Sequence, residues 1–343
     1  LYTLICCYFC MQYFSRPTEK QKLKMVLFKT PLKWFFIYTV IGFCSAIWSV
    51  HPALSGYRAV ECFSLLGVVI ICALELYRKG GIQLLIAWIL RYTVLTSLFR
   101  ACWRIPDWNL FLMASQMDAT IFFYFALLHE KSKLVRWCIY VFSIFSHSTT
   151  AYIGLALGGI GLWFDRKKGK TLFFILSLLT FTAILYMGTE NVLKRTIFSQ
   201  RTEISLAATS GRDKMWELAW NAFDERPLLG YGFFAGEPYI LRENNIGGSV
   251  MNAHNSISSA AIGTGLLGLI PLCIFFLKNI ALLFSPKIPV LYRGGTIGCF
   301  AVVFLHCMGN PGIGSRVYGS WLSAIIYFVL LAIMSLPAEE LKK

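Results

Sequence analysis

The sequence predicts an all-α, polytopic integral membrane protein of about 11 transmembrane helices, with one large loop on the outer face of the membrane. Composition is the first reason, because 57% of the 343 residues are hydrophobic and only 14% are charged. Apolar runs of membrane-spanning length also recur along the chain. Finally, basic residues gather in the short segments between these runs, which is the positive-inside pattern. That pattern explains the net charge of +15 better than nucleic-acid binding does.

The helices are expected in two groups separated by the outer loop. An N-terminal bundle covers residues 1–188, the outer loop residues 189–255, and C-terminal helices residues 256–343. The bundle begins with an apolar run at residues 1–14, and its basic flank follows the run rather than precedes it. We therefore expect this run to be the end of a span that enters the cytoplasm. The authentic protein could have one more helix before it. Further spans are predicted near residues 34–50, 59–76, 82–99, 109–128, 137–148, 150–164, 172–188, 256–277, 294–308 and 317–336.

Two of these spans form a short hairpin, residues 137–164. Basic segments flank it on both sides, so both of its ends should be cytoplasmic. Each arm is shorter than the ~20 residues that a full span needs, so the tip should lie below the outer surface and line a water-filled cavity. Ser148 and Thr149 at the tip would face that cavity. A plain pair of short packed helices is the alternative.

The outer loop should contain an amphipathic helix at about residues 211–223. Ser210 can cap this helix, because its hydroxyl can accept a hydrogen bond from a free backbone N–H of the first turn. Apolar residues then follow at helical spacing, so one face should lie on the membrane surface. Pro227 should end the helix, and Gly230 and Gly232 permit turns that other residues resist.

Two residues at the edges of this polar region are candidates for chemistry. Arg212 is a cation in the first turn of the predicted helix, where the helix dipole favours an anion, so it fits best beside a bound phosphate. A solvated arginine in a long loop is the alternative. His254 stands at the outer mouth of a predicted span, where an imidazole can take a proton from a hydroxyl. Alternatively, Asn255 or Ser256 caps that helix and His254 only packs beside it.

Four arginines run against the positive-inside pattern. They occupy short outer loops or helix ends: Arg58, Arg100, Arg104 and Arg316. The guanidinium group binds phosphate oxygens in a bidentate manner, so a cluster of this kind suits a diphosphate. Contact with lipid headgroups or the membrane interface explains any single arginine equally well, but explains all four together less well.

Other ionisable residues support weaker interpretations. Several lie within or near predicted spans, where they could serve a function or form internal ion pairs: Glu61, Glu75, Arg91 and Asp118. Cys7 and Cys10 have the spacing of a metal or redox motif, but they lie in an apolar segment. No helical pair of histidines or nearby carboxylate supports a metal site. We therefore expect neither a metal nor a cofactor.

Together, these segments resemble the superfamily of O-antigen ligases and O-antigen polymerases, which are membrane glycosyltransferases. The resemblance covers residues from about 45 to 268 and rests on the order and spacing of short motifs. The first motif is Trp48-Ser49-Val50-His51-Pro52 with Arg58 downstream. The others are Ser210-Gly211-Arg212 with Trp216, the run Pro227-Leu228-Leu229-Gly230-Tyr231-Gly232, and His254-Asn255 with Gly265 and Gly268.

The resemblance implies an inverting glycosyltransferase at the periplasmic face of the bacterial inner membrane. Its donor would be a glycan on undecaprenyl diphosphate, and its acceptor either a second lipid-linked glycan or lipid A core. Arg212 and His254 would be catalytic, by holding the diphosphate and by activating the acceptor hydroxyl. Trp216, Asn255, Ser148, Thr149 and the four outer arginines would bind the substrates. The alternative is a transporter or flippase of lipid-linked glycans, for which the outer arginines would form a translocation path.

Overall fold

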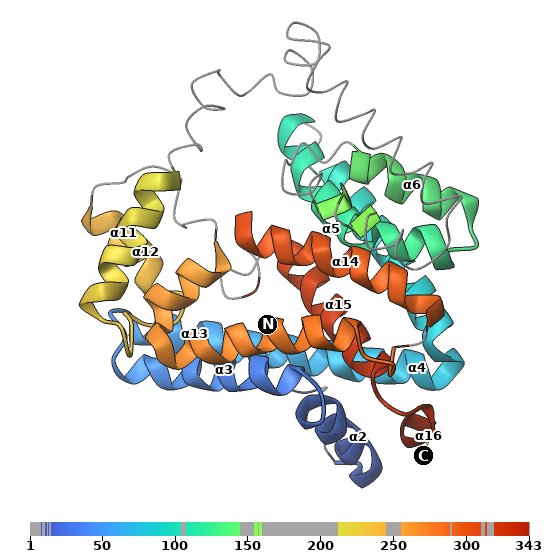
Figure 1. The fold of residues 1–343 in the computed structure, drawn as a ribbon, viewed down its shortest axis with the longest axis horizontal. Coiled ribbons are helices and arrows are strands. Elements are labelled where there is room, and N and C mark those ends of the chain that lie inside the picture. The colour runs from blue at the N-terminus through green and yellow to red at the C-terminus, as the bar shows by residue number, and fades with distance from the viewer. Residues whose placement is uncertain are drawn as a thin grey trace, which may run out of the picture. The chain divides into compact units, whose positions relative to one another are not determined.

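The computed structural model contains helices and no strand over the residues that it describes (Figure 1). These are residues 15–103, 108–144, 212–244, 255–288, 290–309 and 319–342, with a few separate positions (8, 11, 13, 154–156, 158, 159 and 313). The all-helical prediction is confirmed for this part of the chain. The predicted span near 172–188 and the tip of the hairpin lie outside the described residues.

The chain divides into two compact units, each assembled from separate stretches of sequence. Unit 1 comprises Leu1–Ile86, Lys214–Ile288 and Cys307–Lys343, and unit 2 comprises Ala87–Asp213 and Pro289–His306. Unit 1 therefore brings the start of the chain together with residues 214–288 and the C-terminal end of the chain. The first and last of the family-like motifs both belong to it.

In unit 1, helix α3 (Leu32–Cys44) packs along helix α13 (Ser256–Leu283), as Figure 1 shows. Phe275 of α13 makes the contact, with its ring centroid 5.5 Å from Phe35 of α3 and 4.6 Å from Phe328 of α15 (Gly319–Met334). All three side chains are buried. At the end of α3, a 3₁₀ turn (Ser45–Ile47) leads into the Trp48 motif.

Two described helices are long and apolar enough to cross a membrane, namely α13 and residues Pro52–Leu98 of α4 (Pro52–Trp103). Helix α2 (Pro17–Phe28) and the helical stretch that continues from α3 could form a third span, bent by 90°. Helix α4 contains both spans predicted near 59–76 and 82–99, because the break between them at Gly81 is a kink rather than a loop. The basic segment that follows the first apolar run, which was expected only as a cytoplasmic flank, contains helix α2.

Unit 2 contains the end of α4, α5 (Trp108–His129), α6 (Lys133–Ile144) and most of α14 (Val290–Gly309). Its centre is the buried Tyr124, whose hydroxyl donates to the carbonyl of Leu155. The ring of Tyr124 lies close to the backbone of Gly158, where an added Cβ would be only 2.5 Å from the ring. Small residues thus let these segments pack tightly.

Several ionisable residues of the predicted spans form ion pairs. This agrees with the interpretation that they pair internally, which was the alternative to a functional role. The pairs are Arg58–Glu61 at 2.7 Å, Arg78–Glu75 at 2.5 Å and Arg91–Glu130 at 3.9 Å. The first two join residues one helical turn apart on α4. Such pairing lowers the cost of placing these charges in an apolar helix.

Candidate functional site

Helix α13 is broken at Gly265, and this break organises the candidate site. Gly265 has φ 58° and ψ −158°, a conformation that is essentially restricted to glycine. A break of this kind leaves backbone N–H and C=O groups without their partners in the helix. In an apolar environment each such group is costly unless another partner replaces the lost one.

The turn after α11 (Arg212–Glu225) supplies all four replacement partners. The carbonyls of Ile262 and Gly263, which would normally accept from residues four positions later, accept instead from the N–H groups of Tyr231 and Gly232, both at 2.8 Å. The N–H groups of those later residues, Leu266 and Leu267, donate to the carbonyls of Pro227 and Leu228 at 2.7 and 3.3 Å. Two helical hydrogen bonds are thereby exchanged for four that join the turn to the helix.

Glycines make this close approach possible. A Cβ at Gly265 would overlap the backbone carbonyl of Leu228, and a Cβ at Gly230 would overlap the carbonyl of Ile262. Gly230 and Gly232 have φ angles of 64° and 112°, so the predicted glycine turns are confirmed. The glycines of two different motifs are therefore needed at one backbone contact.

The Trp48 motif binds the other side of the same turn. The indole Nε1 of Trp48 donates to the carbonyl of Leu229 at 2.8 Å, and Val50 N donates to the carbonyl of Tyr231 at 2.9 Å. The buried Ser55 hydroxyl donates to the carbonyl of Phe233 at 2.8 Å. We call residues 45–55, 227–233 and 262–267 the motif junction, because three motifs far apart in sequence meet there through hydrogen bonds to backbone groups.

Helices α11 and α12 (Gly236–Glu243) pack onto the motif junction. Their contact is a small apolar core formed by Ala219, Ala222, Tyr231, Ile240 and Ile262. Buried Glu237 of α12 accepts a hydrogen bond from Ser259 of α13 at 2.9 Å. This core and this hydrogen bond fix α12 beside the first half of α13.

The structure describes part of the predicted site. Asn255 is the N-cap of α13, and its side-chain oxygen accepts from the N–H groups of Ile257 and Ser258 at 2.8 and 3.4 Å. The capping interpretation is therefore confirmed for Asn255. Trp216 is half-buried on α11, inside the range expected for an amphipathic helix. Arg58 pairs with Glu61 and lies over the ring of Tyr57 at 5.6 Å, so its charge is already matched.

Other predicted site residues are not placed in detail. For Arg212, the first residue of α11, and Arg100 in α4, the structure describes the helix but not the side chain. The remaining candidates lie outside the described residues: His254, Arg104, Arg316, Ser148 and Thr149. Their roles stay predictions. His254 directly precedes the Asn255 cap in the sequence.

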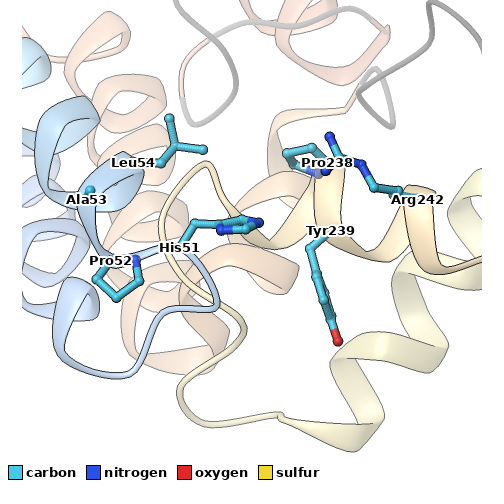
Figure 2. Close-up of a pocket in the computed structure, with 7 residues that line it drawn as sticks. All are labelled: His51, Pro52, Ala53, Leu54, Pro238, Tyr239 and Arg242. Atoms are coloured by element: carbon cyan, nitrogen blue, oxygen red, sulfur yellow. The ribbon is translucent and has the colours of Figure 1, made fainter.

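A pocket of about 470 Å³ opens beside the motif junction (Figure 2). It lies between the start of α4 and α12, and we call it the His51 pocket. Figure 2 shows the imidazole of His51 extending from the start of α4 toward the α12 side chains. The pocket is lined by His51, Pro52, Ala53, Leu54, Pro238, Tyr239 and Arg242. We did not predict a role for Arg242, although Pro238, Tyr239 and Arg242 follow the helical spacing that marks one face.

A second pocket of about 450 Å³ shares Tyr239 with the first and is lined mainly by polar side chains. We call it the Glu225 pocket. The Tyr231 hydroxyl donates to Glu225, and burial together with this hydrogen bond raises the pKa of Tyr231 to about 12. Arg226 lies over the Tyr231 ring at 4.6 Å. The Glu225 pocket is lined by Leu218, Asn221, Ala222, Glu225, Arg226, Tyr231, Tyr239, Ile240, Glu243 and Asn244.

Helices of this length and apolarity, one of them broken and hydrogen-bonded at the break to the backbone of a turn, define an α-helical membrane protein. Comparison with known proteins narrows the class. The family model described as O-Antigen ligase matches residues 134–273, a stretch that contains two of the three segments of the motif junction. The resemblance to this superfamily is thereby confirmed.

Two bacterial relatives match almost the whole chain. One, from Rickettsia prowazekii (strain Madrid E), is 24% identical over 89% of this chain and 81% of its own length. The other, from Rickettsia typhi (strain ATCC VR-144 / Wilmington), is 22% identical over 90% of this chain and 82% of its own length. Each is named "Putative polysaccharide ligase".

Proposed function

We propose that this protein transfers a glycan from undecaprenyl diphosphate to an acceptor hydroxyl at the periplasmic face of the inner membrane. The acceptor is a second lipid-linked glycan in a polymerase, or lipid A core in a ligase. The main support is the motif junction, which joins three motifs of the superfamily into one hydrogen-bonded unit. The family match and the names of the two relatives agree with a role in joining polysaccharides.

The reaction combines two events at the anomeric carbon with a proton transfer from the acceptor hydroxyl. The acceptor oxygen attacks the anomeric carbon from the side opposite the diphosphate, so the configuration inverts. The bond between that carbon and the diphosphate oxygen breaks, and its electron pair leaves with undecaprenyl diphosphate. The acceptor proton passes to the imidazole of His254. Arg212 stabilises the negative charge that grows on the leaving diphosphate.

The motif junction suits this role because its hydrogen bonds join the segments that carry the two candidate catalytic residues. Arg212 begins α11, the helix that leads into the turn 227–233, and His254 directly precedes the cap of the broken helix. The turn and the broken helix are joined by four backbone hydrogen bonds. Positioning of reacting groups contributes strongly to rate, so support from a rigid backbone is valuable near the reacting atoms.

Two substitutions test the proposed chemistry directly. His254→Gln keeps polarity but cannot take a proton near neutral pH, so transfer should fall by about 10²–10⁴-fold. Arg212→Lys keeps the charge but loses the bidentate geometry, so transfer should also fall. The assay is formation of polymer or ligated product in cells that accumulate the lipid-linked donor. Lys287→Gln, a change at an exposed position far along the chain, is the control.

These variants must be compared at equal membrane abundance. Near-normal product from His254→Gln would remove His254 from the mechanism, and full activity in both Arg212→Lys and Arg212→Ala would do the same for Arg212. The face of the membrane is tested separately. A cysteine at exposed Asn244 should react with a membrane-impermeant thiol reagent in intact spheroplasts, above the labelling of the parent chain. Labelling only after lysis would refute a periplasmic loop.

A further inference from the structure

The two pockets that share Tyr239 differ in how their charged side chains are engaged. In the Glu225 pocket, the Arg226 guanidinium covers the Tyr231 ring and two carboxylates, Glu225 and Glu243, supply negative charge. The His51 pocket contains a guanidinium and an imidazole but no carboxylate among its lining residues. None of the described lining residues therefore neutralises the positive charge of this pocket.

Arg242 is the central feature of the His51 pocket. Its side chain is exposed and forms no ion pair with any residue that the structure describes. An unpaired arginine is free to bind an anion, and its planar group favours two oxygens of one phosphate. The imidazole of His51 is also exposed and can add a hydrogen bond from the opposite wall.

The wall formed by α4 adds to the same charge pattern. Close to its beginning, Ser55 N donates a backbone hydrogen bond to the carbonyl of His51 at 3.1 Å. The amides of Ala53 and Leu54 therefore precede the helical hydrogen bonds and have no acceptor within the helix. The start of a helix also carries partial positive charge. These two residues line the pocket together with Pro52 and Pro238, whose apolar surfaces would border an anion on a lipid or a sugar.

We propose that the His51 pocket binds a phosphate group, held by Arg242 from α12 and by His51 at the start of α4. This deepens the proposed function, on which it rests, by naming a site for a phosphate of the substrate. The same chemistry could recognise the diphosphate of the lipid-linked donor or the headgroup of a bulk anionic phospholipid. The volume of about 470 Å³ lies within the range of small-ligand pockets.

The experiment measures binding rather than transfer. Purified protein in detergent is titrated with farnesyl diphosphate, a short isoprenoid diphosphate, by isothermal calorimetry. Arg242→Gln should weaken binding about tenfold or more, because a hydrogen bond to a charged group is lost. His51→Gln should weaken it by a smaller factor. Arg226→Gln is the matched control, because this arginine is also exposed but lines the Glu225 pocket, and it should bind as the wild type does.

Two further arms identify the source of the phosphate. Competition by inorganic pyrophosphate would show that the phosphates themselves are recognised. If nanodiscs of phosphatidylglycerol compete as well as farnesyl diphosphate does, the site serves bulk lipid; if they do not, it serves the donor. Equal affinity of wild type and Arg242→Gln, or an equal loss in Arg226→Gln, would overturn the proposal. The charge-reversed Arg242→Glu should weaken binding more than Arg242→Gln does, and unchanged affinity in that variant would also overturn the proposal.

Failure of this proposal can be told apart from failure of the proposed function. If His254→Gln loses transfer but still binds farnesyl diphosphate as the wild type does, then the pocket and the catalytic proposal stand independently. If Arg242→Gln binds normally while His254→Gln loses transfer, only the pocket assignment is wrong. If His254→Gln retains transfer while Arg242→Gln loses binding, only the catalytic assignment is wrong.

Discussion

Helices α4 and α13 break in the same way but in different surroundings. Gly81 in α4 has φ 75° and ψ −169°, and Gly265 in α13 has φ 58° and ψ −158°. Apart from its chain neighbours and the adjacent backbone of its own helix, no described atom lies within 4 Å of the position that a Cβ on Gly81 would occupy. At Gly265 the same position overlaps the backbone of the turn 227–233. The break at Gly81 is open, whereas the break at Gly265 is filled by a turn that forms four hydrogen bonds with α13.

The two breaks share a backbone conformation, but only the break at Gly265 serves to bind another segment of the chain. A glycine conformation costs any other residue about 1–3 kcal/mol where the surroundings hold it in place. At Gly81 a new side chain would meet no neighbouring atom, so only the backbone conformation itself opposes it. At Gly265 the four hydrogen bonds to the turn hold the conformation in place. The break in α13 should therefore be required for the site, whereas the break in α4 should not.

The largest effect should come from Gly265→Ala. The new Cβ opposes the required φ and also displaces the carbonyl of Leu228, so hydrogen bonds of the motif junction are lost with the conformation. We expect a loss of about 3 kcal/mol or more. Thermal unfolding of the purified protein and its abundance in membranes measure this loss. An unchanged unfolding temperature would mean that the turn does not hold the break.

Ser55→Ala tests the motif junction from its other side. The buried hydroxyl donates to the carbonyl of Phe233 and lies 2.8 Å from the Ser49 hydroxyl. Removing it leaves a buried acceptor without this donor, so stability should fall by about 1–3 kcal/mol. Ser285→Ala, at a half-buried position beyond α13, is a suitable comparison for serine loss in general. Equal losses in both variants would show that the contact with Phe233 has no special weight.

Asn255→Ala should have a smaller effect, confined to the first turn of α13. It removes the cap of Ile257 N and Ser258 N, which is typically worth about 1 kcal/mol. Hydrogen exchange should rise at the first turn of α13 and stay unchanged after Gly265. A loss of protection on both sides of the break would contradict an effect confined to the first turn.

The smallest effect should come from Gly81→Ala. Alanine favours a regular helix by about 1 kcal/mol over glycine, and this gain offsets the cost of the kinked conformation if α4 straightens. We expect an unfolding temperature within a few degrees of the wild type. A destabilisation as large as that of Gly265→Ala would remove the distinction between the two breaks.

Local signals in the sequence predicted local structure well. The turns at Gly230 and Gly232 and the helix near 211–223 follow from single residues and short periodic patterns, and the structure has a helix at Arg212–Glu225 and positive φ at both glycines. Asn255 was one of two residues expected to cap α13. Such features depend on interactions within a few residues, which a single sequence contains directly.

The contacts of the motif junction could not be predicted in this way. Trp48 binds the carbonyl of Leu229 across 181 positions, and no local pattern specifies a backbone partner at that distance. The motifs were therefore interpreted as candidate chemistry, although several of their residues hold the fold. Likewise, Arg58 was expected to bind a phosphate, whereas it forms an ion pair with Glu61 one helical turn away. The break at Gly81 was expected as a loop, because hydropathy cannot distinguish a kink from a short turn.

The order of the three segments along the chain also affects how the protein is made. During synthesis the ribosome completes residues 45–55 first, the turn 227–233 next and the break of α13 last. The turn that pairs with the break, and the segment 45–55 that binds this turn, are thus both synthesised before the break itself. The carbonyls of Ile262 and Gly263 can therefore be paired as soon as they enter lipid, because the segment that pairs with them has already been translated.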